Sequence, residues 1–246
     1  MTVTLDGVLG GGIRLRQPTR GYRAGLDAAL RAAACDASPG QRVIDVGCGV
    51  GAVMLAAAVR RPGAAFLGIE RDPAALTLAG DNIADNGLAE RVGAVAGDVA
   101  TPFSTLGRAP FDAALANPPF FDDPSALRGP GDAKRAAWIA DDGVAGWAAF
   151  LIKAVREGGT ITLIHRADRL AHLLAALGGK TGSFQIRPVH PFADSPAKRV
   201  ILRAVKTGRA PLRLLPPLIL HERDGAKHTA RAEAILRGEA ELAWEP

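Results

Sequence analysis

The sequence predicts an α/β fold: a doubly wound, mainly parallel seven-stranded sheet with an antiparallel last strand and a short N-terminal hairpin. The main observation is an alternation, because from residue 41 onward apolar segments of strand length are followed by segments of helix length. A second observation is the polar segment 191–199, which is short enough to return the chain antiparallel to the strand before it. Such alternation places helices on both faces of the sheet.

Each element follows from its own residues. Residues 2–17 alternate and turn at three glycines, 10–12, which predicts the hairpin. Pro73 opens a helix and Gly87 stops it. The predicted strands are 42–46, 64–70, 92–96, 111–116, 159–164, 185–190 and 200–205, with a further short one at 218–221. The predicted helices are 22–35, 51–60, 73–86, 147–157, 166–177 and 228–237. Residues 121–143 lack periodicity, as functional or mobile loops often do.

The length of 246 residues suits one large α/β domain. We expect residues 1–40 to form a hairpin and helix that pack on a core of residues 41–206. Residues 207–246 are expected to form a tail that packs on the same core, so that the chain is a single domain overall.

Composition excludes several classes of protein. No apolar stretch reaches the roughly 18 residues of a membrane span, and the N-terminus lacks the features of a signal peptide. The two cysteines, Cys35 and Cys48, cannot form a disulfide framework or a four-cysteine metal site, and the five histidines show no metal-ligand spacing. We therefore expect a cytoplasmic protein, a monomer by default, that needs neither a metal nor a membrane.

The charge is +5 overall and is concentrated at the two ends of the chain. Residues 1–44 carry six arginines against three acids, and residues 187–237 carry 11 basic against four acidic residues. If both ends fold onto one face, that face would attract a polyanion such as RNA. Because 24 of the 30 basic residues are arginine, the excess could also reflect genome base composition.

A glycine-rich turn, residues 45–51, joins the first core strand to a helix. Glycines there allow positive φ and a close approach of the backbone to a ligand at the helix N-terminus. Gly47, Gly49 and Ala52 also fit a dinucleotide fingerprint, so the turn by itself leaves the ligand open. Glu70, at the end of the next strand, suits a pair of ribose hydroxyls in either case.

Three polar positions at strand ends favour S-adenosyl-L-methionine over a dinucleotide. Asp45 places a carboxylate in the turn, which suits an ammonium group and repels a pyrophosphate. Asp98 follows the third strand and can accept a hydrogen bond from an adenine amine. The fourth strand ends in Asn117-Pro118-Pro119-Phe120, which is unsuited to a nicotinamide.

That last tetrapeptide predicts a corner that binds a planar amine. The prolines end the strand, because neither can donate to a sheet ladder. An asparagine oxygen and the Pro118 carbonyl can each accept a hydrogen bond from an NH₂ group, and Phe120 can stack on a flat ring. A strand-ending turn with a core phenylalanine would have the same sequence, so the tetrapeptide alone leaves both open.

Together these motifs resemble the class I S-adenosylmethionine-dependent methyltransferases, which have a Rossmann-like fold, and within them the amino-methylating group with an Asn-Pro-Pro-(Phe/Tyr) motif. Gln17-Pro18, the segment 21–27 and the segment 220–225 are similar to bacterial tRNA adenine N(6)-methyltransferases, which act beside the anticodon of a valine tRNA. The doubled Phe120-Phe121 departs mildly from the pattern, because the last motif position is often Tyr.

The resemblance implies a role for each matched residue. Asp45, Gly47 and Gly49 would hold the methionine moiety, Glu70 the ribose and Asp98 the adenine. The segment Tyr22-Arg23 would cover the cofactor pocket. Residues implied in catalysis are Asn117, Pro118, Pro119 and Phe120, with Asn117 also beside the cofactor.

The resemblance further implies methyl transfer to the exocyclic amine of a nucleobase, above all adenine N(6) in tRNA. We expect the substrate to be contacted by Phe120 and Phe121 and by the basic pairs Lys134-Arg135 and Lys198-Arg199. A protein N(5)-glutamine methyltransferase and an rRNA guanine N(2)-methyltransferase would use the same corner. A non-catalytic RNA-binding module and a nucleotide-binding oxidoreductase are the alternatives from other classes.

Overall fold

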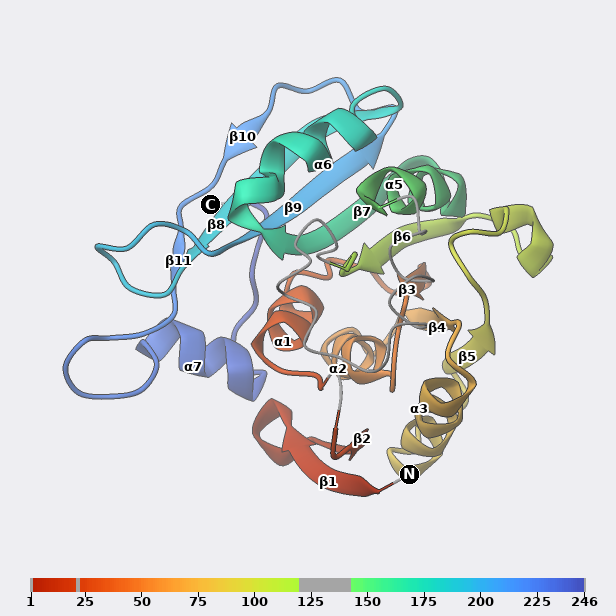
Figure 1. Cartoon of the computed structure of the whole chain (residues 1–246), viewed down its shortest axis with the longest axis horizontal. Helices are drawn as coiled ribbons and strands as arrows, with labels where there is room; N and C mark the ends of the chain where they lie inside the picture. The colour runs from red at the N-terminus through yellow and green to blue at the C-terminus, as the bar shows by residue number, and fades with distance from the viewer. Residues whose placement is uncertain (1, 21–22, 120–142, 246) are drawn as a thin grey trace.

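A nine-stranded sheet crosses the molecule in the computed structural model, which describes residues 2–20, 23–119 and 143–245 (Figure 1). The strand order is β10-β8-β9-β7-β6-β3-β4-β5, and β11 also pairs with β8. The strands are β3 (Arg42–Val46), β4 (Ala65–Glu70), β5 (Val92–Ala96), β6 (Phe111–Ala116), β7 (Val155–Arg166), β8 (Thr181–His190), β9 (Arg199–Lys206), β10 (Arg213–Leu214) and β11 (Leu218–Ile219). Only β9 runs antiparallel to its neighbours.

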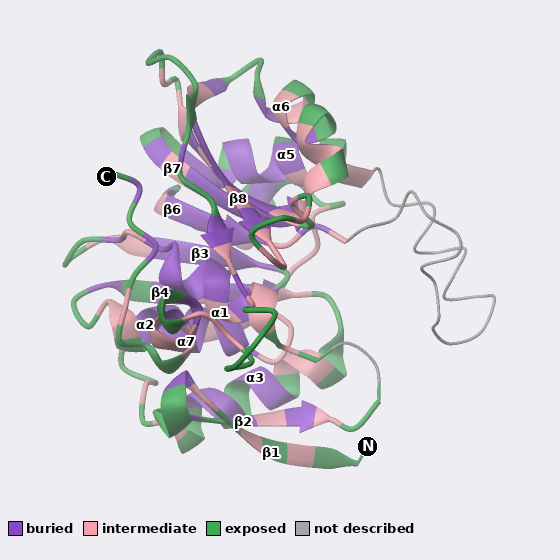
Figure 2. Ribbon diagram, turned by 90° about the vertical axis from the view of Figure 1, so that its left-hand side faces the viewer, coloured by how far each residue is buried: buried purple, intermediate pink, exposed green. Residues whose placement is uncertain are grey.

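Helices cover both faces of this sheet, as Figure 1 shows. One face carries α1 (Leu26–Ala33), α2 (Ala52–Arg60) and α3 (Pro73–Asp85), and the other carries α5 (Gly143–Ala154) and α6 (Leu170–Leu177). Successive β3 residues supply both cores, because Val43 packs with α2 while Ile44 packs with α5. The buried residues therefore form two layers separated by the sheet (Figure 2).

The N-terminal hairpin pairs β1 (Val3–Val8) with β2 (Ile13–Pro18) outside the helical layer (Figure 2). A 3-10 turn, η1 (Leu9–Gly11), connects the two strands. Asn82 of α3 holds the hairpin: its Oδ1 accepts from the Arg16 amide at 2.7 Å, and its Nδ2 donates to the Arg16 carbonyl at 3.1 Å and to the Val50 carbonyl at 2.9 Å. The hairpin is thus fixed to the same helix that lies next to the glycine turn.

The last 40 residues return to the sheet and to α1. After β10 and β11, α7 (Ala230–Arg237) packs against α1. The buried Trp244 then donates its indole N–H to the Ala34 carbonyl at 2.8 Å, and the Trp244 carbonyl accepts from Gln185 of β8 at 2.7 Å. These contacts join the end of the chain to the start of the core.

The predicted fold class is confirmed, although the sheet has nine strands where seven were predicted, because β10 and β11 add to it beside β8. The other differences are at element ends and in short elements. The helix predicted over 22–35 begins only at Leu26, since Gly25 has an extended, non-helical backbone. The helix predicted over 147–157 spans Gly143–Ala154, because Val155 already pairs with Phe111 as the first residue of β7. The 3-10 helices η2 (Phe103–Leu106) and η4 (Ala167–Arg169) and the short β10 were not predicted.

No helix within the described ranges is both long and apolar enough to cross a membrane.

Candidate functional site

The predicted site residues meet at the carboxyl edge of four neighbouring strands. The order is β6, β3, β4, β5, and the chain reverses direction across the sheet between β3 and β6. Val46 lies opposite both Ala116 and Ile69, and Glu70 lies opposite Ala96, so the residues after these positions share one edge. At about 4.8 Å per strand, this edge spans about 14 Å from β6 to β5. Ligands of open α/β sheets bind at such a reversal point.

The glycine turn is held by β4 and remains open on one side. Gly47 and Gly49 have left-handed backbones, with φ of 68° and 56°. The amides of Gly47 and Cys48 both donate to the Ile69 carbonyl, at 2.9 and 3.0 Å. A Cβ on Gly47 would lie 2.7 Å from the indole of Trp147, whereas no atom of the described residues lies within 4 Å of a Cβ on Gly49. Within the described part of the chain, the turn is therefore closed by Trp147 at Gly47 and open at Gly49.

Glu70 links the end of β4 to this turn. Its Oε2 accepts from the Gly49 amide, and its Oε1 accepts from the amides of Arg71 and Asp72, all at 2.9 Å. Each carboxylate oxygen offers two lone-pair directions, so Oε2 retains one for a hydroxyl of a ligand. The hydrogen bonds fix the orientation of the carboxylate before any ligand arrives.

Asp45 lies beneath the turn and forms an ion pair that the sequence did not reveal. Its carboxylate is fully buried and faces Arg31 of α1 at 3.4 Å. Burial raises the pKa of the Asp45 carboxyl to about 6, while the Arg31 guanidinium opposes that rise. Neither Asp45 oxygen has a hydrogen-bond partner of good geometry among the described residues, and neither do Nε and Nη1 of Arg31. Within the described residues, this pair thus retains both hydrogen-bond donors and hydrogen-bond acceptors without a partner.

Asn117 directly follows β6 at the reversal point. Its side-chain Oδ1 is buried and lacks a hydrogen-bond partner among the described residues. Pro118 is buried and Pro119 half-buried, so the corner is set in a rigid backbone. A buried acceptor without a donor is uncommon in native structures. The corner is therefore able to accept a hydrogen bond from an amine.

Two further predicted cofactor residues already have protein partners. Asp98 Oδ1 accepts from the Ala100 amide at 2.9 Å, and its Oδ2 lies 4.0 Å from Arg71. Arg23 reaches back to the hairpin, where it pairs with Asp6 at 2.6 Å and donates to the Pro18 carbonyl at 2.9 Å. The side chain of Arg23 therefore anchors the hairpin in this structure.

The predicted substrate residues are only partly described. Lys198 is exposed just before β9, and Arg199 pairs with Asp27 of α1 at 3.0 Å. The predictions for Tyr22, Phe120, Phe121, Lys134 and Arg135 fall outside the described residues. Within the described ranges, no group of three or more His, Cys, Asp or Glu side chains could hold a metal ion.

Sequence reasoning missed Arg31 and Trp147. Arg31 is the only basic residue in the Ala/Leu-rich helix α1, and such an isolated charge on an apolar helix signals a buried partner. Trp147 carried no comparable signal, because its contact depends on the packing of α5 over the glycine turn.

The described part of the site fits S-adenosylmethionine. The open backbone at Gly49 admits a ligand, and the carboxylates of Glu70 and Asp98 lie along the same edge. An acidic edge suits a ligand that carries a sulfonium and an ammonium cation. Asn117, whose Oδ1 has no hydrogen-bond partner among the described residues, follows β6 on the other side of the glycine turn from Glu70 and Asp98.

Comparison with known proteins gives a family match over the core of the chain. Residues 26–128 match the model of the methyltransferase small domain. This segment begins with α1 and continues past β6, so it contains the glycine turn, Glu70, Asp98 and Asn117. The resemblance expected from the sequence is confirmed.

Two curated relatives illustrate the range of substrates. A release factor glutamine methyltransferase of Gloeobacter violaceus is 42% identical over 86 residues, which are 35% of this chain and 29% of that protein. A tRNA1(Val) (adenine(37)-N6)-methyltransferase of a Flavobacteriaceae bacterium is 34% identical over 101 residues, 41% of this chain and 42% of that protein. The chain spans less than half of the length of each of these relatives.

A solved structure covers most of the chain. The crystal structure of a protein from Agrobacterium tumefaciens, described as a predicted O-methyltransferase, is similar over 88% of this chain and 98% of its own length. Its TM-score is 0.73 and its sequence identity 25%.

Proposed function

We propose that this chain methylates adenine N(6) in RNA, above all in tRNA. The premise is that it is an S-adenosylmethionine-dependent methyltransferase, with a match to the methyltransferase small domain over residues 26–128. The observation that carries this proposal is the buried Oδ1 of Asn117 at the reversal point of the sheet, which has no hydrogen-bond partner among the described residues. Only a donor can satisfy that oxygen, and the exocyclic amine of adenine is a planar donor of the required kind.

In the proposed mechanism, Asn117 and Pro118 act on the amine. S-adenosylmethionine supplies an electrophilic methyl group when it is bound. The lone pair of the target amine is delocalised into the ring, so the amine is a poor nucleophile. Hydrogen bonds from its two N–H groups to Asn117 Oδ1 and to the Pro118 carbonyl would localise that lone pair on nitrogen. This is catalysis by orientation and preorganised electrostatics, and it requires no strong base.

The cofactor contacts are part of the proposal. Glu70 would accept from a ribose hydroxyl and Asp98 from the adenine amine of the cofactor. The turn at Gly47 and Gly49 would hold the methionine end. Asp45 would act from beneath the turn, where it lies between Arg31 and the backbone of the turn.

The target base must leave its stack to reach Asn117, which costs a few kcal/mol. Stacking of the base on Phe120, as predicted from the sequence, would return about 1–3 kcal/mol. A nucleotide that is already unpaired avoids most of this cost, which favours a loop of a structured RNA.

A second candidate is supported by one observation. The Gloeobacter relative with 42% identity is named a release factor glutamine methyltransferase. A glutamine side chain also presents a planar NH₂, so the same corner could bind it. The length of the match does not separate the two candidates, because a relative from Chlorobaculum tepidum that is also named a release factor glutamine methyltransferase aligns over 165 residues and the flavobacterial tRNA relative over 101.

The deciding experiment is methyl transfer from labelled S-adenosylmethionine into separate tRNA, rRNA and protein fractions, followed by nucleoside and amino-acid analysis. We expect label in N(6)-methyladenosine of the tRNA fraction. Label confined to glutamine would overturn the RNA proposal in favour of the second candidate. Label in guanosine would retain RNA and exclude adenine.

The Asn117→Ala variant separates catalysis from cofactor binding. Removal of the oxygen should lower kcat by about 10²–10³-fold, the usual loss for one preorganised hydrogen-bond partner. Affinity for S-adenosylhomocysteine, measured by calorimetry, should change less than threefold, roughly within 0.7 kcal/mol. Turnover within a factor of three of the wild type would refute the assigned role of Asn117.

A further inference from the structure

Two loops hold each other at one corner of the molecule, and we call them the clasp: residues 191–198, after β8, and residues 220–229, after β11. The guanidinium of Arg223 donates to both carboxylate oxygens of Asp194, at 2.8 to 3.1 Å. The backbone adds a second link, because the His221 amide donates to the Pro191 carbonyl at 2.9 Å. The two loops therefore have a fixed relative position.

Flat groups gather in this clasp. The rings of His221 and His228 are stacked, with centroids 5.0 Å apart, and the ring of Phe192 lies 5.7 Å from that of His221. The guanidinium carbon of Arg223 lies 4.7 Å above the centre of the Phe192 ring. Arg223 is thus held from below by an aromatic face and from the side by a carboxylate.

The stability of the fold does not account for this arrangement. The side chains of Arg223 and Asp194 are 59% and 64% exposed, and exposed ion pairs contribute little to stability. Ordering a long arginine side chain also costs conformational entropy. What the clasp does provide is a guanidinium plane that is preorganised at the surface, which lowers the cost of binding a planar partner.

The clasp lies at the same sheet edge as Asn117. Strand β11 is parallel to β8, and β7 is parallel to β6. Because β9 is antiparallel to both β8 and β7, all four strands run in the same direction, and the C-terminal ends of β8 and β11 lie at the carboxyl edge. Four strand spacings separate β11 from β6, about 19 Å. One extended ligand could therefore occupy both the clasp and the amine-binding corner.

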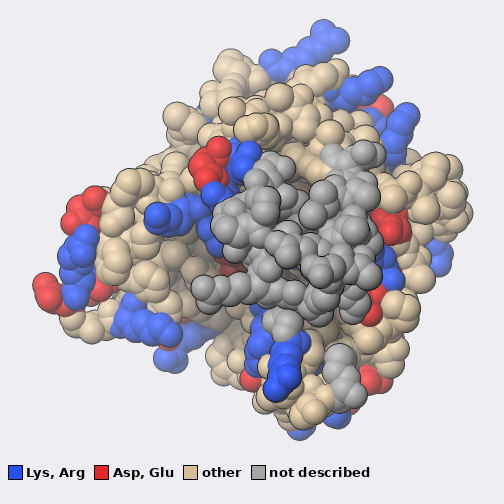
Figure 3. Space-filling view, in the orientation of Figure 1, with Lys and Arg blue, Asp and Glu red and all other residues tan. Residues whose placement is uncertain are grey.

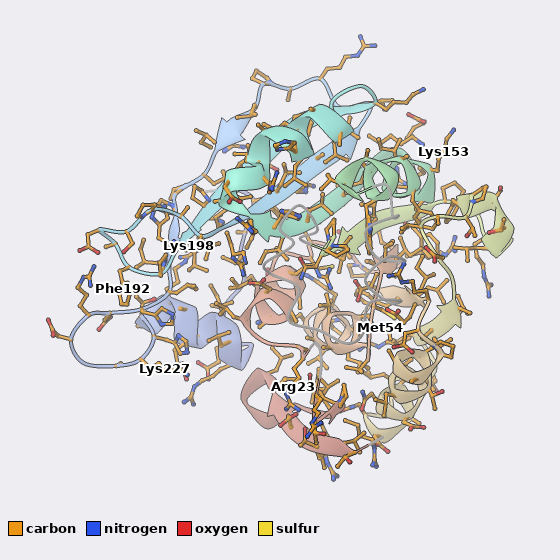
Figure 4. The ribbon with its side chains drawn as sticks, in the orientation of Figure 1. Arg23, Met54, Lys153, Phe192, Lys198 and Lys227 are labelled. Carbon is orange, nitrogen blue, oxygen red and sulfur yellow. The ribbon has the colours of Figure 1, made fainter. Side chains whose placement is uncertain are left out.

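The clasp holds three basic and three acidic residues, and an excess of positive charge lies in the segments beside it. Lys198 and Lys227 are exposed, and no carboxylate of the described residues pairs with either. Along this edge, the segments 165–169, 190–199 and 220–231 hold seven basic and four acidic residues. Figure 4 shows Phe192 with Lys198 and Lys227 on one side of the molecule, while Lys153 lies on the other.

We propose that the clasp is a docking surface for RNA, on which an unpaired base stacks on the outer face of Arg223 while Lys198 and Lys227 contact phosphates. Unpaired bases bind to guanidinium planes and aromatic faces, and phosphates bind to lysines, so the mixed surface fits single-stranded parts of a structured RNA. A protein substrate would need neither a stacking plane nor phosphate contacts. This inference rests on the proposed function and specifies where its substrate binds away from the reacting base.

The test compares Arg223 with a matched arginine. Arg237 is 57% exposed and pairs with Glu233 at 2.8 Å, but lies on α7 outside the clasp. The variants are Arg223→Lys, Arg223→Ala, Lys227→Glu and Arg237→Ala, and binding of bulk tRNA is measured by fluorescence anisotropy across salt concentrations. Melting temperature and S-adenosylhomocysteine affinity serve as checks that each variant is folded.

We expect Arg223→Ala to weaken tRNA binding at least fivefold, and Arg223→Lys, which retains the charge, to weaken it at least threefold. The salt dependence should fall for Arg223→Ala and for Lys227→Glu, and stay unchanged for Arg223→Lys. Arg237→Ala should bind tRNA like the wild type. Equal losses at Arg223 and Arg237, or wild-type binding by both Arg223 variants, would overturn the clasp proposal and leave adenine methylation standing.

Failure of the proposed function has a different outcome. A wild-type protein that neither binds nor methylates any RNA fraction, and transfers methyl only to protein, would overturn both the function and the clasp. Methylation of tRNA by the wild type together with an unchanged kcat/KM of Arg223→Ala for tRNA would overturn the clasp alone.

Discussion

At the scale of single residues, the basic side chains show why the charge distribution along the sequence predicted an RNA-binding face only weakly. Arg31 and Arg187 are buried, and Arg187 donates to the Pro216 and Ala243 carbonyls. Arg199 and Arg203 pair with acids of the N-terminal part, Asp27 and Asp36. These four arginines are thus used in packing and in internal ion pairs, and Figure 3 shows Lys and Arg side chains spread over the face in view with Asp and Glu among them.

The pH dependence of stability tests the buried Asp45. Its folded-state pKa of about 6 exceeds the ordinary value of 3.8, so the folded state holds the proton more tightly than the unfolded state. The contribution of this group to the free energy of unfolding is therefore complete below about pH 4 and is lost as the pH rises through 6. Asp45→Asn lacks this titration.

Urea unfolding of the wild type and of Asp45→Asn from pH 4 to pH 7 measures the effect. Across that range the wild type should lose about 2 kcal/mol relative to the variant, since each pKa unit corresponds to about 1.4 kcal/mol and the unfolded carboxyl is already more than half ionised at pH 4. A constant offset, from the Arg31 charge left without its partner, is expected in addition. Two parallel pH profiles would show that Asp45 titrates normally.

At the scale of elements, the sequence predicted correctly those strand and helix ends that are set by neighbouring residues. Strands β5 and β6 have the predicted limits, and α3 begins at the predicted Pro73. The ends of α5 and β8 could not be predicted, because pairing with distant strands lengthens β7 and β8 beyond their apolar centres. Likewise Asn117 was identified from its strand-ending prolines, whereas Arg31 and the clasp depend on contacts between distant segments.

The two glycines of the turn form a matched pair for mutation. Gly47→Ala combines left-handed strain of about 1–2 kcal/mol with a clash against Trp147, which adds about 1–3 kcal/mol. Gly49→Ala carries only the strain, because its surroundings are open. Urea unfolding should therefore rank Gly47→Ala as the less stable of the two.

A double variant checks the cause. Trp147→Leu should destabilise the wild type but recover part of the loss in Gly47→Ala, which gives a favourable coupling energy in a double-mutant cycle. Strictly additive losses would mean that Trp147 does not limit the space at Gly47. Conversely, Gly49→Ala should weaken S-adenosylhomocysteine binding more than it weakens the fold, if the ligand approaches the turn there.

At the scale of the whole molecule, the tail is expected to be part of a single folding unit. Leu215, Leu218, Ile235 and Trp244 belong to one buried cluster with Leu30 of α1. The sequence pattern predicted the helix α7 and one short strand but not what they pack against, because α7 contacts α1 and the strand pairs with β8, both distant in sequence.

Removal of the Trp244 side chain tests this unit. Trp244→Ala should lower the free energy of unfolding by about 3–5 kcal/mol, as for other buried aromatics, and unfolding should remain a single transition. Leu214→Ala, at a side chain that is 70% exposed in the same tail, should change it by less than about 0.5 kcal/mol. A separate early transition for Trp244→Ala would instead identify the tail as an independent unit.

The buried side chain of Asn82 determines how the N-terminal hairpin responds to a ligand at the glycine turn. Its amide joins the Arg16 backbone of the hairpin to the Val50 carbonyl of the glycine turn. Loosening of either segment therefore disturbs the hydrogen bonds of the other. By thermodynamic reciprocity, a ligand that orders the turn also slows amide exchange in the hairpin, and a hairpin that opens lowers affinity at the turn by the same factor. The N-terminal strands are in this way coupled to occupancy of the site.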